Sequence, residues 1–154
     1  MATYHDVLSI SPRLWPVVSE VAADVVGKTG KAYYCRIQRS LEFKIFCGHA
    51  LMAHATRVTS GRSTWISLVQ NEVEFGRIYI IWTPFGDKLA LGAEVYRMPS
   101  LWQPQLMPLG LRFSRWGFTG LRSHRVEVYQ ESSTMTALVL LTYLHGRGIF
   151  VEGG

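Results

Sequence analysis

Residues 32–47, AYYCRIQRSLEFKIFC, decide the fold expected for this chain. The first half, residues 32–38, is rich in β-prone side chains. In the second half, apolar residues occupy every other position: Leu41, Phe43, Ile45 and Cys47. Alternation with a period of two is typical of a strand with one buried face. With residues 39 and 40 as the turn, the stretch predicts two consecutive strands.

More strands are expected on the C-terminal side of this stretch. Residues 49–59 fit either a short helix or a strand, and we favour a strand. Residues 65–69, 73–82 and 89–96 are each β-prone, and the last two are joined by a short Pro/Gly/Asp link at 83–87. Short links between successive strands favour an antiparallel meander.

Two helices are expected to flank the meander. In residues 11–30, apolar side chains recur at spacings of three and four, as an amphipathic helix requires: Leu14, Val17, Val18, Val21, Ala22 and Val25. Residues 134–144 follow Ser133 as a helix N-cap and precede Gly146, and they are apolar on nearly all sides. Short strands at 125–129 and 149–151 flank this second helix. The order predicts one α+β domain over residues 1–154, an antiparallel β-meander packed against an N-terminal and a C-terminal helix.

Length and composition limit the class of protein. A chain of 154 residues is long enough for one domain with its own core. Apolar residues make up 48% and charged residues 18%, which excludes disorder for most of the chain. No stretch reaches the ~18 consecutive apolar residues of a membrane span, and the N-terminus has no secretory signal. We therefore expect a cytoplasmic protein without a membrane partner, with Cys35 and Cys47 as reduced thiols in the core.

The net charge of +5 comes from a single segment. Between Glu94 and Glu127 there is no Asp or Glu, but there are five arginines: Arg97, Arg112, Arg115, Arg122 and Arg125. Five of the 16 basic residues lie here, so the remaining 11 balance the 11 acidic residues elsewhere. Three prolines and three glycines interrupt the same region, and we predict a long irregular basic and aromatic segment at 97–125.

Aromatic rings interleave with these arginines, and together they form the candidate binding residues: Arg97, Trp102, Arg112, Phe113, Arg115, Trp116, Arg122, His124 and Arg125. Arg and Trp are enriched at the hot spots of protein interfaces. Guanidinium groups and rings also bind the phosphates and bases of single-stranded nucleic acid. A third interpretation is a loop whose rings fill the core of the domain itself.

The sequence favours a binding protein over an enzyme. Cys47, His49 and His54 lack the paired spacing of zinc sites, no phosphate-loop motif occurs, and we expect no metal or cofactor.

We expect an inhibitor or accessory factor, of the kind carried by phages and mobile elements, that docks on an acidic protein surface or a nucleoprotein complex through the 97–125 segment. The alternative is a direct binder of single-stranded nucleic acid or RNA, and self-association is left open.

A second alternative comes from the C-terminal end of the chain. Residues 125–129, RVEVY, followed by residues 136–150, TALVLLTYLHGRGIF, resemble the closing part of GNAT-type N-acetyltransferases. In that family a strand precedes a helix ending in Tyr and a further strand that bears Gly and Phe. The resemblance implies an acyl-CoA-dependent N-acetyltransferase in which Tyr143 is the general acid that protonates the leaving thiolate of coenzyme A.

Overall fold

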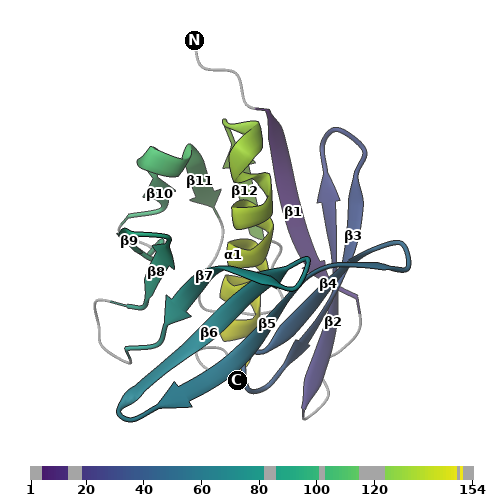
Figure 1. Ribbon diagram of the computed structural model, residues 1–154. Helices are drawn as coiled ribbons and strands as arrows, with labels where there is room; N and C mark the ends of the chain where they lie inside the picture. The colour runs from purple at the N-terminus through teal and green to yellow at the C-terminus, as the bar shows by residue number, and fades with distance from the viewer. Residues whose placement is uncertain are drawn as a thin grey trace.

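The computed structural model describes residues 5–13, 19–81, 86–100, 103–114, 124–148 and 150. Strands make up most of these residues and are followed by an α-helix near the C-terminus (Figure 1). The strands are β1 (Asp6–Pro12), β2 (Glu20–Gly27), β3 (Ala32–Gln38), β4 (Phe43–Cys47), β5 (Ala50–Ser60), β6 (Ser63–Gln70), β7 (Val73–Tyr79), β8 (Lys88–Leu91), β9 (Glu94–Arg97), β10 (Gln105–Leu106), β11 (Leu111–Ser114) and β12 (His124–Val128). The helices are α1 (Thr134–Arg147) and two short 3-10 segments, η1 (Met107–Leu109) and η2 (Glu131–Ser133).

All twelve strands belong to one antiparallel sheet, in the order β10-β11-β12-β1-β2-β3-β4-β5-β6-β7-β8-β9. The first and last strands of the chain lie side by side, with Leu8 of β1 opposite Val126 of β12. The two edges of the sheet are therefore β9 and β10, which are consecutive along the chain. The sheet curls around α1 and comes close to closing into a barrel (Figure 1).

The helix α1 fills the interior of the curled sheet. Residues 136–146 are all buried, as expected for a helix that is apolar on nearly all sides, and α1 contacts β12, β1, β3 and β4. Gly146 lets the helix approach β3, because a Cβ there would lie 2.5 Å from Cγ2 of Ile37. Within the described ranges, no helix has the length and apolar character needed to cross a membrane.

The predicted α+β class is wrong, because β2 stands where the N-terminal helix was expected. Val21, Ala23 and Val25 all point into the core from β2. Apolar residues in this segment satisfy both a helical spacing and an alternating one, so the pattern alone is ambiguous. Pairing of β2 with β1 on one side and β3 on the other decides in favour of the strand. Residues 14–18 of the predicted helix lie outside the described residues.

Much of the predicted meander is confirmed. The strand expected at 32–38 is β3, the segment favoured as a strand at 49–59 is β5, and the helix expected at 134–144 is α1. The single strand expected at 89–96 is two strands, β8 and β9, because Gly92 turns the chain with φ of 60°. The segment 97–125 is more regular than predicted, since it contains β10, η1 and β11.

The two cysteines differ in their surroundings. Both are free thiols, and Cys35 is buried as predicted. Cys47 is exposed, contrary to the prediction of a core thiol. Cys47 is the last residue of β4 and lies opposite Ala50, the first residue of β5, so it stands at the end of the hairpin, where alternation no longer ensures burial.

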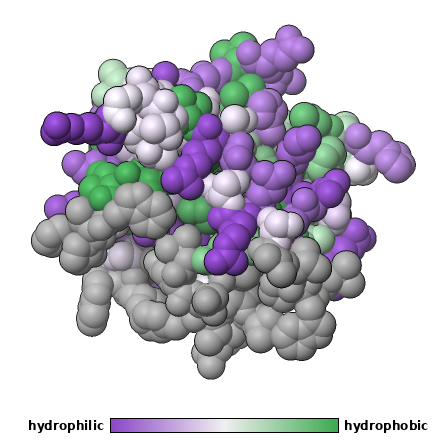
Figure 2. Space-filling model, turned by 90° about the horizontal axis from the view of Figure 1, so that it is seen from below, coloured by the Kyte–Doolittle hydropathy of each residue, from purple (hydrophilic) through white to green (hydrophobic). Residues whose placement is uncertain are grey.

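Exposed hydrophobic side chains are dispersed over the sheet. The large ones belong to different strands and links: Val26, Leu51, Val73, Ile81, Val95 and Met107. Seen from below, hydrophobic residues form small separate groups among hydrophilic ones (Figure 2). Hydrophobic residues scattered singly are normal for a protein surface, so these side chains mark no contact patch among the described residues.

Candidate functional site

The structure separates the binding residues predicted from the sequence into three groups. Arg97, Arg112 and Arg125 are exposed on the outer face of the sheet, on β9, β11 and β12. Phe113 and His124 are each 1% exposed and point into the core. The remaining four lie outside the described residues: Trp102, Arg115, Trp116 and Arg122.

His124 faces a second buried histidine, His145 on α1. Their Nδ1 atoms lie 3.2 Å apart, and neither Nε2 atom has a hydrogen-bond partner among the described residues. Burial lowers the pKa of His124 to about 4. Burial, together with the nearby His124, lowers the pKa of His145 to about 4. Both imidazoles are therefore neutral at pH 7, and in the described part of the chain no group of three metal-ligating side chains includes them.

Tyr143, the residue to which the acetyltransferase resemblance gives a catalytic role, anchors α1. Its hydroxyl donates to Oδ2 of Asp87 at 2.7 Å, and Nη1 of Arg147 donates to the same oxygen at 2.6 Å. The backbone N–H of Ile81 donates to the other oxygen, Oδ1, at 3.1 Å. Burial and the neighbouring Asp87 raise the pKa of Tyr143. These contacts tie the C-terminal end of α1 to the segment before β8.

A row of aromatic and cationic side chains crosses the outer face of β6–β9. In the strand register, Trp65 lies opposite Tyr79, Tyr79 opposite Lys88, and Lys88 opposite Arg97. Residues directly opposite each other on antiparallel strands point to the same face of the sheet. These four side chains therefore form a continuous line, which we call the cation/aromatic row. Of these four residues the sequence predicted Arg97 alone, because the other three become its neighbours only through strand pairing.

The aromatic end of the row is already occupied by contacts within the protein. The Trp65 and Tyr79 rings lie 5.9 Å apart, and the guanidinium carbon of Arg77 lies 4.7 Å from the centre of the Trp65 ring. Arg77 also pairs with Glu74 at 2.7 Å. One face of the Trp65 ring is thus covered by a cation whose charge is balanced locally.

The cationic end of the row lacks such partners. Lys88 and Arg97 are both exposed, and no hydrogen bond or ion pair joins either side chain to another described residue. Like charges placed directly opposite on neighbouring strands destabilise a sheet. A negatively charged group bound between Lys88 and Arg97 would remove this repulsion.

A groove lies beside Arg97, at the seam between the two edges of the sheet. Its volume is about 530 Å³. It is lined by residues of β9, of β10 and of the segments that flank them: Tyr96, Arg97, Met98, Gln103, Pro104, Gln105, Leu106, Met107 and Pro108. Among these nine residues Arg97 carries the single charge, so the groove has a positive character.

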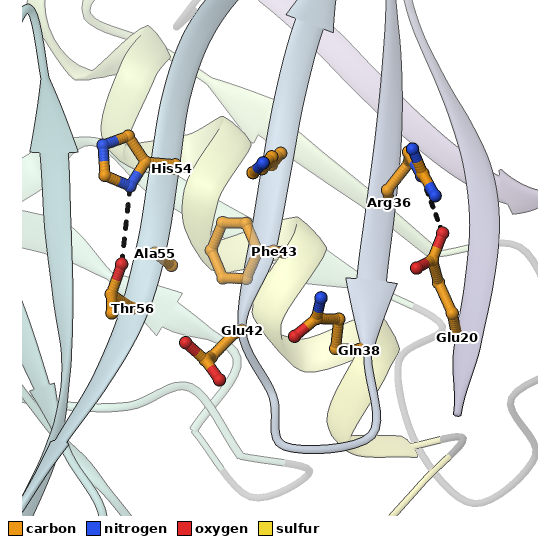
Figure 3. Close-up of a pocket in the computed structure, with 9 residues that line it drawn as sticks. Glu20, Arg36, Gln38, Glu42, Phe43, His54, Ala55 and Thr56 are labelled. Atoms are coloured by element: carbon orange, nitrogen blue, oxygen red, sulfur yellow. Dashed lines mark hydrogen bonds and ion pairs between the residues drawn. The ribbon is translucent and has the colours of Figure 1, made fainter. Parts of the chain in front are cut away.

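A second hollow, of about 190 Å³, lies on the outer face of β2–β5 (Figure 3). Arg36, Lys44 and His54 follow one another in the register of β3, β4 and β5. Arg36 pairs with Glu20 at 2.6 Å, and Glu42 also lines the hollow. Two carboxylates and two cations thus line this hollow, whereas no carboxylate is among the nine described residues that line the seam groove.

Comparison of the chain with models of protein families, with curated proteins and with solved structures finds no significant match to any of them.

Proposed function

We propose that this protein is an inhibitory or accessory binding factor that docks on an acidic protein surface, alone or within a nucleoprotein complex, through Lys88 and Arg97. The observation that carries the proposal is the pair of exposed cations placed directly opposite each other, without a carboxylate partner among the described residues. An acidic partner supplies the missing counter-charge. We place the protein in the cytoplasm, and its two free thiols, Cys35 and Cys47, suit a reducing compartment.

The geometry favours a protein partner over single-stranded nucleic acid. Proteins that bind single strands stack bases on open aromatic rings, but in the cation/aromatic row Arg77 covers one face of Trp65. On the other side of the seam, Arg112 lies directly opposite Glu127, which offsets its charge locally. Lys88 and Arg97, in contrast, lie opposite each other, and no carboxylate among the described residues pairs with either.

Affinity capture from the native host cell tests the proposal. We expect wild-type protein to retain its partner proteins after nuclease treatment, and the double variant Lys88→Glu, Arg97→Glu to retain at least about tenfold less, since about 1.4 kcal/mol changes affinity tenfold. The matched control is Lys31→Glu, Arg39→Glu, which makes the same charge change at exposed positions on either side of β3. Equal capture by wild type and by the Lys88/Arg97 variant contradicts the proposal.

The nucleic-acid alternative predicts a different result. Binding to phosphates releases counterions, so its affinity falls steeply as salt rises. A mobility shift of single-stranded RNA or DNA that disappears with salt and requires Arg97 would replace the protein partner by a nucleic acid. The proposal predicts no such shift.

A further inference from the structure

We propose that the seam between β9 and β10 binds an extended acidic segment of the partner protein as an additional β-strand on the edge of β9. This inference rests on the proposed function and specifies the form in which the partner presents its acidic groups. The segment places its carboxylates beside Arg97 and its alternate side chains in the groove.

Among the described residues, no strand pairs with the seam-facing edge of either β9 or β10. In the described chain β9 pairs with β8 alone and β10 with β11 alone, and no backbone hydrogen bond between described residues joins β9 to β10. The link between them is closed by two reciprocal backbone bonds of 3.0 Å between Ser100 and Gln103. Unpaired N–H and C=O groups on a sheet edge are a template for another strand.

The two edges are not equivalent as templates. Pro104 and Pro108 lie on the β10 side of the groove, and β10 itself has two residues. Proline has no N–H to donate to a ladder and is typical of protected edges. The four residues of β9, Glu94–Arg97, contain no proline. We therefore assign the added strand to the β9 edge.

The groove determines which side chains the added strand carries on its inner face. Tyr96 lies opposite the buried Leu89, and Leu106 opposite the buried Leu111, so both point inward. Met98, which is 7% exposed, also lines the groove. Side chains alternate between the two faces of a strand, and every second residue of the partner segment meets this apolar floor.

The outer face of the added strand meets its positive charge on the β9 side, because on the β10 side Glu127 offsets the charge of Arg112. Arg97 is on the rim, with Lys88 opposite it on β8. Across the groove, Gln105 is on the other rim, with Arg112 opposite it on β11. No carboxylate is present among the nine lining residues. This charge complementarity selects a segment in which acidic and apolar residues alternate.

A defined peptide tests the inference without knowledge of the partner. The probe is the dye-labelled peptide Glu-Leu-Glu-Val-Glu-Leu with blocked ends, and binding is followed by fluorescence anisotropy. We expect the same residues in block order, Glu-Glu-Glu-Leu-Val-Leu, to bind at least about tenfold more weakly. Two further peptides carry N-methyl groups on alternate amides. One is methylated on its odd-numbered residues and the other on its even-numbered residues. We expect at least one of them to lose binding, because N-methylation removes the donors of a ladder.

Two further measurements locate the bound peptide. We expect amide hydrogen exchange in residues 94–98 to slow when the alternating peptide is present. Arg97→Glu should weaken binding about tenfold or more, while the control Arg39→Glu, an exposed arginine in the turn after β3, leaves it unchanged. If circular dichroism shows that Arg97→Glu does not fold, the methylated peptides on the wild-type protein decide the question.

The results that overturn the inference are equally specific. Equal binding of the block peptide, full binding of both methylated peptides, or unchanged exchange in residues 94–98 each contradicts strand addition at the seam. If these occur while Lys88→Glu, Arg97→Glu still abolishes partner capture, the seam inference is wrong and the proposed function stands. If capture is also unaffected by that double variant, the proposed function is wrong as well.

Discussion

Asp87 and Lys88 are neighbours in the chain, yet Asp87 belongs to a buried cluster of balanced charge and Lys88 to an exposed pair of like charges. Inside the curled sheet, Asp87 is 3% exposed and accepts hydrogen bonds from Tyr143 and Arg147. Outside, Lys88 faces Arg97 across the strand pair, and no described carboxylate joins them. The comparison teaches that charge inside the fold is balanced because burial makes imbalance costly, whereas Lys88 and Arg97 on the outer face have no described counter-charge, which we propose a partner supplies.

The largest effect is expected from breaking the inner cluster. Asp87→Ala removes the carboxylate that accepts from both Arg147 and Tyr143, and removing one partner of a buried ion pair costs about 3–5 kcal/mol. Urea unfolding followed by circular dichroism measures this loss. Lys88→Ala, one residue along the chain, is the control and should change the free energy of unfolding by less than about 0.5 kcal/mol. Equal effects of the two substitutions would remove the distinction between the clusters.

The two buried histidines should make the inner region sensitive to acid. Folding lowers the pKa of His124 and His145 to about 4, from an ordinary value of 6.5. Protonation therefore favours the unfolded chain, and the stability present above pH 6.5 is lost as the pH falls toward 4. The expected slope is at most about 1.4 kcal/mol per pH unit for each histidine. Urea midpoints between pH 7 and pH 5 measure it.

A variant that lacks these two buried imidazoles is the control for this acid sensitivity. His124→Leu with His145→Leu removes two buried Nε2 atoms that have no partner among the described residues, and replacing both members of a buried polar pair by apolar groups is often nearly neutral. We expect stability near that of the wild type at pH 7 and a shallower dependence between pH 6.5 and 5. An unchanged dependence would show that other groups cause the acid sensitivity.

The smallest effect is expected on the outer face. Lys88→Gln or Arg97→Gln removes the repulsion between opposed cations and should leave stability unchanged or raise it by a few tenths of a kcal/mol. Arg77→Gln, at the other end of the row, should destabilise, because Arg77 contacts Glu74 and the Trp65 ring. Thermal unfolding of the three variants ranks them. A substantial loss on replacing Lys88 or Arg97 would give these cations a structural role.

The sequence predicts the fold where periodicity is unambiguous. Alternation at Phe43 and Ile45 matches β4, and the apolar residues of 134–144 match the buried helix α1. Residues 20–27 could not be assigned in this way, because apolar residues there satisfy two periods at once. Their strand conformation depends on β1 and β3, which are remote in the chain. The curled, nearly closed sheet likewise depends on the pairing of β1 with β12, for which no local pattern gives a signal.

The candidate site was predictable only in part. The segment rich in arginine led to Arg97, which lies at the seam. The same reasoning counted Phe113 and His124 among the candidate binding residues, although each lies two positions from a buried residue of its strand, Leu111 or Val126, and so points inward with it. The number of charged residues in a segment carries no information on this alternation. It also cannot find Lys88, which becomes the neighbour of Arg97 through strand register.

Zero-length cross-linking tests the central claim most directly. A carbodiimide joins a lysine amine to a carboxylate in contact with it, and the chain has four lysines, Lys28, Lys31, Lys44 and Lys88. We predict that mass spectrometry of the captured, nuclease-treated complex finds Lys88 joined to an Asp or Glu of the partner protein. Cross-links to the partner through Lys28, Lys31 or Lys44 with none through Lys88 would contradict the assignment of the outer cations to an acidic protein partner.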